Sequence, residues 1–485
     1  EDFVAASGVL EFAPGQTSAT FELGILNDEL AEGAETISLA LVDPQPVRGR
    51  WEKALLGTPN MATLTVIDDE TVNQPAGSVD TAFNSGAGAN DFVNVIALLP
   101  DGKFMLGGDF TQVNGLFRDR LARLNADGTL DATFDLGQGV NGSVRAMAIQ
   151  PDGRAILVGF FTSVNGESRN GIARLNYDGS VDGTFNPGGG ADNPVHDVVL
   201  QQDGKLIIVG DFASYNGYNR SRVARLNNDG TLDKGFDVGT GADLLVNSVV
   251  VQPDGKILIG GDFAHFDGNA LTGIARLNNN GGVDVSFDPG TGFNESVRKL
   301  VVQEDGRILA GGFFTEFNGV ARNRVIRLMK DGSLDDSFNV GAGANGSVYS
   351  MVIQSDGRIL LGGSFNTFSN LSRNGIVRLN RNGSVDTTIN FGTGANGSVL
   401  DIAILPDYKI LVGGGFTLFD GLEREYFVQL HGGIIEGSGT LEFAEPFYRV
   451  SEVGTNATVH VVRRGGLSGM VNVNIATLLS AGDSP

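Results

Sequence analysis

The sequence predicts an all-β protein: a seven-bladed β-propeller, with strands of a β-sandwich at the two ends of the chain. Three observations predict this fold. A phrase typified by "PDGKFMLGGDF" returns at a constant spacing, Asp-Gly and Asn-Gly turns separate short apolar strands, and both chain ends show strand-like alternation of another kind. No stretch carries helical periodicity with capping residues, so helices are not expected.

The two ends of the chain are predicted to contribute strands of one type of sandwich. In residues 1–70, "GVLEFAPGQTSATFELGILND", "ETISLALVDP" and "ATLTVIDDE" alternate apolar and polar residues. Residues 434–485 contain "GTLEFAEPFYRVSEVGTNATVHVVRRGGLSGMVNVNIATL", which reads as three more strands. Residues 71–74 are expected to link the first segment to the propeller.

The repeats are predicted to occupy about residues 75–433. Each unit reads as four short strands, which in the second unit are "SVRAMAIQ", "AILVGFF", "GIARLN" and "SVDGTFN". Four strands per unit fit a propeller blade, whereas a β-solenoid, the alternative, usually has shorter rungs. The Asp of the repeated phrase recurs every 51 residues, as Asp101, Asp152, Asp203, Asp254, Asp305, Asp356 and Asp407.

Ring closure is predicted from the position of the last fourth strand. The pattern "DGTLDATF" follows six of the seven phrases, and the missing copy stands in front of them as "AGSVDTAFN". Its Asp80 lies 51 residues before Asp131 and so keeps the register. Residues 78–84 are therefore expected to complete the last blade, which leaves no exposed sheet edge.

Two resemblances follow from these motifs. The phrases "PDGK/R-I-L-x-G-G-x-F" and "A-R-L-N-x-D-G-S/T-x-D-x-x-F-N" resemble the delta-60 β-propeller repeat of large bacterial surface or secreted proteins. That family offers no established activity. The two end segments resemble the Calx-β domain, an immunoglobulin-like sandwich that binds calcium. The tail matches its opening strands and the head matches its later strands, so the sandwich is split between the two ends.

The Calx-β resemblance implies a Ca²⁺ site built from carboxylates, because oxygen ligands suit this hard cation. Two departures from the family pattern suggest fewer ions than in the sodium/calcium exchanger. Asn27 replaces an Asp, and the loop "LLSAGDSP" lacks an acidic residue that is usual earlier in this loop. The family's metal ligands map onto Glu452, Asp2, Asp28, Glu32, Glu35, Asp68, Asp69 and Glu70.

The split sandwich predicts an assembly. The chain begins at Glu1 rather than Met, and we expect it to be a fragment or a processed product. One hypothesis is a head-to-tail array of copies, either a cell-surface fibre or a giant tandem-repeat protein, in which successive units complete each junction. The alternative is that tail and head fold together within one chain. The short linkers favour the array.

Composition excludes several functions. The formal net charge of −23 disfavours nucleic acid and anionic membranes as partners and should attract divalent cations. The absence of cysteine excludes disulfides, thiolate catalysis and Cys-type zinc sites. No apolar run reaches about 18 residues, so no membrane insertion is expected.

Polar residues that recur once per blade predict architecture rather than a site. We expect blade-to-blade Arg–Asp bridges from these series, with a ligand site in the central channel as the alternative. One Arg series is 118, 169, 220, 322, 373 and 424; a second is 123, 174, 225, 276, 327 and 378. The Asp series is 80, 131, 182, 233, 284, 335 and 386. A Phe series expected in the core is 110, 161, 212, 263, 314, 365 and 416.

Less regular residues leave a binding function open. Asp109, Asp211 and Asp262 of "GGDF" are replaced in the other copies, which indicates either a binding patch or sequence drift. The four histidines show no metal-ligand spacing, HExxH and GxSxG are absent, and no catalytic or cofactor-binding residue is predicted.

These observations favour a non-enzymatic, extracellular structural or adhesive protein with calcium-stabilised Calx-β junctions. The alternative is a binding module, an adhesin without filament assembly whose propeller recognises a glycan or a surface protein. A propeller hydrolase or lyase is a third hypothesis.

Overall fold

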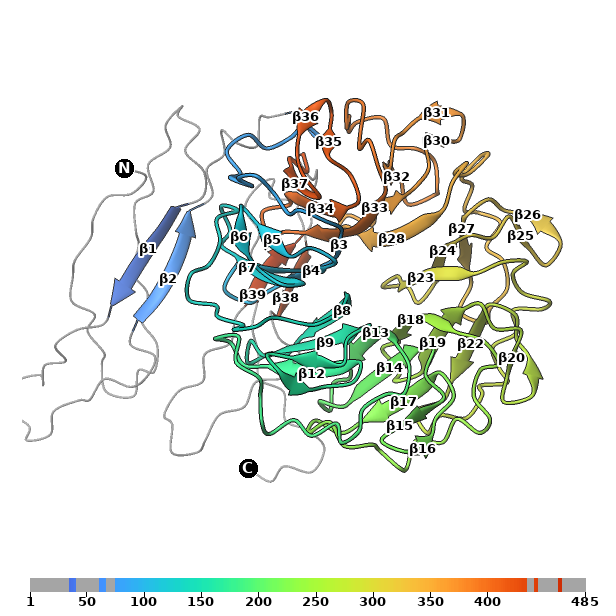
Figure 1. Cartoon of the computed structure of the whole chain (residues 1–485). Coiled ribbons are helices and arrows are strands. Elements are labelled where there is room, and N and C mark those ends of the chain that lie inside the picture. The colour runs from blue at the N-terminus through green and yellow to red at the C-terminus, as the bar shows by residue number, and fades with distance from the viewer. Residues whose placement is uncertain (1–34, 41–60, 67–74, 434–439, 444–460, 465–485) are drawn as a thin grey trace, which may run out of the picture. The chain divides into compact units, whose positions relative to one another are not determined.

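The computed structural model describes residues 75–433 and, at the chain ends, the backbone of residues 35–40, 61–66, 440–443 and 461–464 (Figure 1). Every regular element in these ranges is a β-strand, so the predicted all-β fold class is confirmed. The chain divides into two compact units, residues 75–432 and residues 1–74 with 433–485. The described ranges contain no apolar helix of membrane-spanning length.

The described end segments are two antiparallel strand pairs. β1 (Glu35–Ala40) pairs with β2 (Met61–Val66), and Glu35 lies opposite Val66. β38 (Thr440–Phe443) pairs with β39 (Val461–Arg464). Both pairs fall within the segments predicted to be sandwich strands.

Residues 75–433 contain seven three-stranded antiparallel sheets, the blades, in each of which the strands follow one another across the sheet in chain order. The first strands are β3 (Val93–Leu98), β8 (Val144–Ile149), β13 (Val195–Leu200), β18 (Val246–Val251), β23 (Val297–Val302), β28 (Val348–Ile353) and β33 (Val399–Ile404). The second strands are β4 (Phe104–Gly108), β9 (Ala155–Gly159), β14 (Leu206–Gly210), β19 (Ile257–Gly261), β24 (Ile308–Gly312), β29 (Ile359–Gly363) and β34 (Ile410–Gly414). The third strands are β7 (Leu121–Leu124), β12 (Ile172–Leu175), β17 (Val223–Leu226), β22 (Ile274–Leu277), β27 (Val325–Leu328), β32 (Ile376–Leu379) and β37 (Phe427–Leu430).

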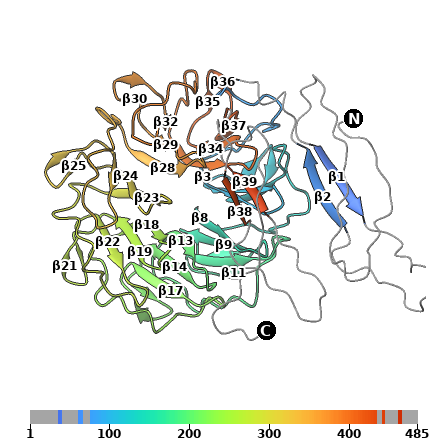
Figure 2. The same cartoon turned by 180° about the vertical axis from the view of Figure 1, so that it is seen from behind.

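A small outer hairpin, which the sequence did not predict, joins the second and third strands of each blade. The first strands lie around the centre of the ring in Figures 1 and 2, and these hairpins lie toward its periphery. The hairpins are β5 (Gln112–Val113) with β6 (Leu116–Phe117), β10 (Ser163–Val164) with β11 (Glu167–Ser168), β15 (Ser214–Tyr215) with β16 (Tyr218–Asn219), β20 (His265–Phe266) with β21 (Asn269–Ala270), β25 (Glu316–Phe317) with β26 (Val320–Ala321), β30 (Thr367–Phe368) with β31 (Leu371–Ser372), and β35 (Leu418–Phe419) with β36 (Leu422–Glu423).

The predicted fourth strand is shorter than expected. In the first blade it is a single bridge between Leu124 and Leu130, and the same bridge recurs in the other blades. The Asp131 carboxylate accepts a hydrogen bond from the Thr133 amide at 2.9 Å. This local turn takes the amide away from a strand ladder, so the fourth segment ends after one bridge.

The leading segment of the propeller pairs with its last sheet. Val79 bridges Leu430 of β37, and the Asp80 amide donates to the Gln429 carbonyl at 2.9 Å. One apolar cluster contains Phe83 and Val93 from the beginning of the ring together with Leu411 from its end. The ring of blades is therefore closed by hydrogen bonds and by a shared core.

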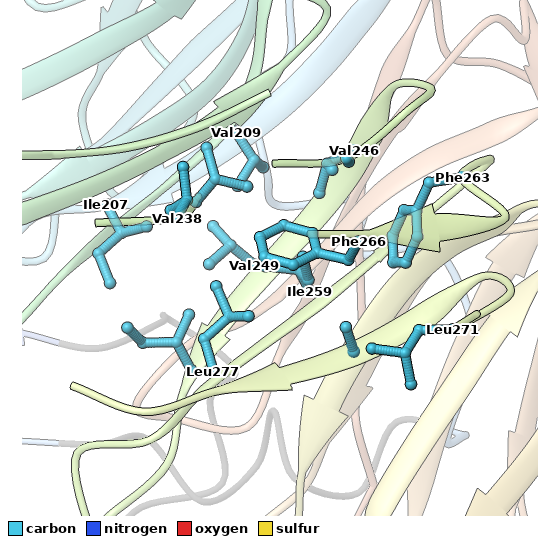
Figure 3. Close-up of a cluster of buried hydrophobic side chains, with 14 of the residues drawn as sticks. Ile207, Val209, Val238, Val246, Val249, Ile259, Phe263, Phe266, Leu271 and Leu277 are labelled. Atoms are coloured by element: carbon cyan, nitrogen blue, oxygen red, sulfur yellow. The ribbon is translucent and has the colours of Figure 1, made fainter. Parts of the chain in front are cut away.

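Each seam between neighbouring blades is filled by apolar side chains. Figure 3 shows one such cluster, in which Ile207 and Val209 of β14 pack with Val249 and Ile259 of the next blade. Glycine permits the closest approach at several seams. A Cβ at Gly413 would lie 2.7 Å from a methyl group of Val93, across the closing seam. The first glycine of the repeated "GG" is thus a packing requirement between blades.

Candidate binding site at the inner strands

A β-bulge lies at the start of every first strand. In the first blade the pairing of β3 with β4 shifts between Val93 and Val95, which leaves Asn94 as the extra residue. The same shift occurs in the other six blades. Opposite each bulge stands a glycine, and a Cβ at Gly108 would collide with the Phe92 carbonyl oxygen. A bulge re-aims a side chain, and bulges are frequent next to functional sites.

The bulged residues form a set that we call the bulge ring. Its backbone frame is constant, because a valine precedes every bulged residue and a glycine faces every bulge. The side chains differ from blade to blade. The bulge ring is Asn94, Arg145, His196, Asn247, Arg298, Tyr349 and Leu400. Residues that follow the facing glycines flank it: Asp109, Phe160, Asp211, Asp262, Phe313, Ser364 and Gly415.

Cluster A joins polar and aromatic groups of the first three blades; it is Asn94, Asp109, Ser143, Arg145, Phe160 and His196. The Asn94 Nδ2 atom donates to Asp109 Oδ2 at 3.3 Å and to Ser143 Oγ at 3.1 Å. Arg145 Nη1 donates to Asn94 Oδ1 at 3.3 Å, and its guanidinium lies 4.7 Å from the centre of the Phe160 ring. Asn94 therefore links a carboxylate to a guanidinium that is stacked on an aromatic face.

Cluster B repeats this arrangement in the fourth to sixth blades; it is Asn247, Asp262, Ser296, Arg298, Phe313 and Tyr349. Asn247 Nδ2 donates to Asp262 Oδ1 at 2.9 Å and to Ser296 Oγ at 3.1 Å. Arg298 Nη1 donates to Asn247 Oδ1 at 2.7 Å, and its guanidinium lies 4.4 Å from the Phe313 ring centre.

His196 of cluster A is held in its neutral form. Burial lowers the pKa of His196 to about 4, and the positive charges of Arg145 and Arg298 act in the same direction. Asp211 and Asp262 act in the opposite direction. The His196 ring meets the Phe160 ring edge-on at a centroid distance of 5.2 Å. At neutral pH the imidazole is thus an uncharged aromatic group with one N–H donor and one acceptor.

The seventh blade gives the bulge ring an apolar sector. Leu400 is its bulged residue, and Gly415 leaves room for the neighbouring Phe92, whose ring would collide with a side chain there. Phe92 is 44% exposed and packs near Tyr426 at a centroid distance of 6.1 Å. The side chains of the bulge ring therefore lack sevenfold symmetry, although the backbone that carries them repeats seven times.

The second Arg series pairs differently from the predicted blade-to-blade bridge. Arg225 Nε donates to Asp233 Oδ2 at 2.8 Å within one blade, because the third strand and the fourth segment lie side by side. The link to the next blade is a hydrogen bond from Arg225 Nη1 to the Asn279 carbonyl at 2.5 Å. The pairs with this geometry are Arg123–Asp131, Arg174–Asp182, Arg225–Asp233, Arg276–Asp284, Arg327–Asp335 and Arg378–Asp386. The predicted Arg–Asp pairing is confirmed, the prediction that it links neighbouring blades was wrong, and the series is part of the framework.

The other repeated series also belong to the framework. The predicted Phe series is buried in all seven blades, so its assignment to the core is confirmed. The first Arg series lies at the outer hairpins. Arg118 Nη1, for example, donates a hydrogen bond to the carbonyl oxygen of the preceding residue, Phe117, at 2.7 Å. By contrast, Asp109 and Asp262 of the irregular "GGDF" set lie in clusters A and B. Sequence reasoning missed the bulged residues beside them.

The predicted calcium ligands Glu452, Asp2, Asp28, Glu32, Asp68, Asp69 and Glu70 lie outside the described residues. Glu35 lies in β1, where only the backbone is described. Within the part of the chain that the structure describes, no group of three or more His, Asp or Glu side chains could hold a metal ion.

Comparison with solved structures gives likenesses of low identity. The WD40 β-propeller domain of Doa1 is 15% identical, with 71% of this chain and 93% of that domain covered and a TM-score of 0.45. The extracellular domain of BT4673 from B. thetaiotaomicron is 15% identical at a TM-score of 0.47. That match covers 76% of this chain, which spans only 40% of that domain. The gluconolactonase XC5397 from Xanthomonas campestris is 13% identical, with 74% and 94% covered and a TM-score of 0.36.

Comparison with protein families places two kinds of domain in the chain. No curated protein matches its sequence. The family described as "Domain of unknown function (DUF5122) beta-propeller" matches six segments: residues 99–134, 150–185, 201–236, 252–287, 303–338 and 354–388. The Calx-beta domain family matches residues 1–70 and 436–481. The chain therefore carries a DUF5122 β-propeller repeat region with Calx-beta segments at both ends.

Proposed function

We propose that this protein is a non-enzymatic adhesion module that acts outside the cell, and that its propeller binds a glycan at the bulge ring. The single observation that carries the proposal is the loss of symmetry at the bulge ring. A framework that needs only to be rigid can repeat the same residue in every blade, as the buried Phe series does. A binding site needs a specific asymmetric set, and the bulge ring supplies one.

The chemistry of the clusters suits a sugar. Phe160 is 39% exposed and offers an aromatic face against which sugar C–H groups can pack. Beside it, the amide of Asn94, the carboxylate of Asp109 and the guanidinium of Arg145 are planar groups that exchange hydrogen bonds with hydroxyls.

Binding is favoured over catalysis by the state of the polar groups. His196 has a pKa of about 4 because of burial and two nearby guanidinium groups, so it is a weak base at neutral pH. Ser143 and Ser296 accept hydrogen bonds from Asn94 and Asn247, and Ser296 also donates to Asp262 Oδ1. Within the described residues no histidine bonds either serine, so neither has the Ser–His pairing that activates a serine nucleophile.

A glycan array tests this proposal. The double variant Phe160→Ala with Phe313→Ala should lose about tenfold or more in affinity for any glycan that the wild type binds, since each lost aromatic contact costs about 1 kcal/mol. The control is Phe117→Ala in an outer hairpin, where the side chain is 58% exposed. Equal binding by the double variant and the control would show that the ligand lies elsewhere.

A second proposal concerns the Calx-beta segments. The family matches both residues 1–70 and residues 436–481, which supports a sandwich whose strands come from both segments. We propose that successive copies complete this sandwich in a head-to-tail array and that calcium, held by the acidic residues named above, stabilises the junction. Sedimentation velocity with calcium and with EDTA tests this: the larger species should dissociate in EDTA. A single small species in both conditions would contradict the array.

A further inference from the structure

Clusters A and B are related by a shift of three blades. Each residue of cluster A has its counterpart 153 residues later, as Arg145 does in Arg298. Five of the six positions carry the same residue type, and the sixth is His196 in cluster A and Tyr349 in cluster B. The other bulge-ring residue, Leu400, belongs to neither cluster. The bulge ring thus combines a sevenfold backbone with a duplicated set of side chains.

The side-chain interactions are duplicated as well as the residues. In each cluster the Asn donates to the Asp, to the Ser and to a valine carbonyl of the next blade. In each, the Arg donates to the Asn and stacks on the Phe. Phe160 then meets His196 edge-on, and Phe313 meets Tyr349 in the same way. Two places in one ring are therefore built to the same plan.

Each cluster has a cation that the protein leaves unpaired. Within residues 75–433, neither Arg145 nor Arg298 has a carboxylate within 4.0 Å of its guanidinium, whereas Arg225 pairs with Asp233 at 2.8 Å. Only Nη1 of each of these two arginines donates a hydrogen bond among the described residues. Their Nε atoms are buried without a partner. A ligand would therefore meet the Nη atoms, which form charge-assisted hydrogen bonds with carboxylate oxygens.

Resting on the proposed function, we infer that the bulge ring contains two equivalent subsites, and that each binds the carboxylate of an acidic sugar. The guanidinium of Arg145 or Arg298 holds the carboxylate, and the Phe beneath it fixes the plane of the guanidinium. The Asp of each cluster accepts hydrogen bonds from the sugar hydroxyls. A uronic-acid oligosaccharide that occupies both subsites would bind more tightly than either residue alone, because the second contact is intramolecular.

The residues that differ between the clusters allow each subsite to be observed separately. Protein with ¹³C-labelled His and Tyr rings would be titrated with oligogalacturonate, oligoglucuronate and oligomannuronate, and with the uncharged methyl ester of each. The His196 resonance reports cluster A and the Tyr349 resonance reports cluster B. The variants are Arg145→Gln and Arg298→Gln, with Arg118→Gln in an outer hairpin as the control.

The expected result is that at least one acid shifts both resonances while its methyl ester shifts them at least tenfold more weakly. Arg145→Gln should abolish the His196 response and retain that of Tyr349, Arg298→Gln should do the reverse, and Arg118→Gln should change neither. A ligand that shifts only one resonance, or an ester that binds as well as its acid, would overturn the two acidic subsites but leave the proposed glycan site standing. No response to any acid or ester would overturn both.

Discussion

The Arg–Asp framework makes the sharpest prediction about stability. Asp233 accepts hydrogen bonds from Arg225 Nε and from Lys205 Nζ, each at 2.8 Å, and from the Gly235 amide at 2.9 Å. Burial alone would raise the pKa of Asp233, but these hydrogen bonds outweigh it and lower the pKa to about 2. Asp233→Asn removes the charge, keeps the shape, and leaves the buried guanidinium without its partner.

The expected loss follows from the pKa. A fall from 3.8 to about 2 corresponds to roughly 2.4 kcal/mol of stability at neutral pH. Breaking a buried pair costs about 3–5 kcal/mol, so we expect Asp233→Asn to lower the free energy of unfolding by about 2–4 kcal/mol. Because the pKa is lowered on folding, the stabilisation is present above pH 3.8 and is lost as the pH falls through about 2.

Urea unfolding followed by circular dichroism at pH 7 measures this loss. The matched control is Asp336→Asn, the same exchange at a side chain that is 84% exposed and pairs with Arg322 on the surface. It should cost less than about 1 kcal/mol. The difference between the wild type and Asp233→Asn should shrink below pH 4. An Asp233→Asn variant no less stable than the control would refute the role given to the Arg–Asp pairs.

Three further predictions address the seam, the electrostatics and the metal. A Cβ at Gly413 would lie 2.7 Å from Val93, so Gly413→Ala should lower the free energy of unfolding by about 1–3 kcal/mol. The control is Gly183→Ala, because a Cβ at Gly183 meets nothing within 4 Å. It should change the free energy of unfolding by less than about 0.5 kcal/mol. If both cost the same, the closing seam is not tightly packed. Burial and the charges of Arg145 and Arg298 lower the pKa of His196 to about 4. NMR titration of Arg145→Gln should therefore show a higher pKa for His196. An unchanged pKa would contradict the placement of this guanidinium. Calcium at about 100 times its dissociation constant should add about 2.7 kcal/mol of stability. EDTA should therefore lower the unfolding temperature of the calcium-bound protein. Identical melting curves with and without EDTA would count against a calcium site.

The propeller could be predicted from the sequence because the signals for its strands and turns are short motifs that recur in every repeat. Asp-Gly turns set the ends of the strands, and the constant spacing set the blades. The position of Asp80, one period ahead of Asp131, pointed to the pairing that the structure shows between Val79 and Leu430. The Arg–Asp pairing was predicted, but its placement within one blade was not, because spacing alone does not reveal that a third strand and the segment after it lie side by side.

The bulge ring could be predicted only in part. The irregular residues Asp109 and Asp262 were visible as a departure from the repeat, and the structure places both beside the bulged residues. The bulge itself is a shift of pairing register, which appears only when two strands are aligned with each other. A signal was available nevertheless: the valine recurs in every copy, whereas the residue after it changes from copy to copy. Arg145 and Arg298 stand at that position.

The most direct test of the central claim is a crystal structure of this protein with a bound uronic-acid oligosaccharide. We predict carboxylates of the sugar within hydrogen-bonding distance of Arg145 and Arg298, with sugar rings against Phe160 and Phe313. Ligand density at the outer hairpins, or at the other end of the first strands, would contradict the claim that the bulge ring is the binding site.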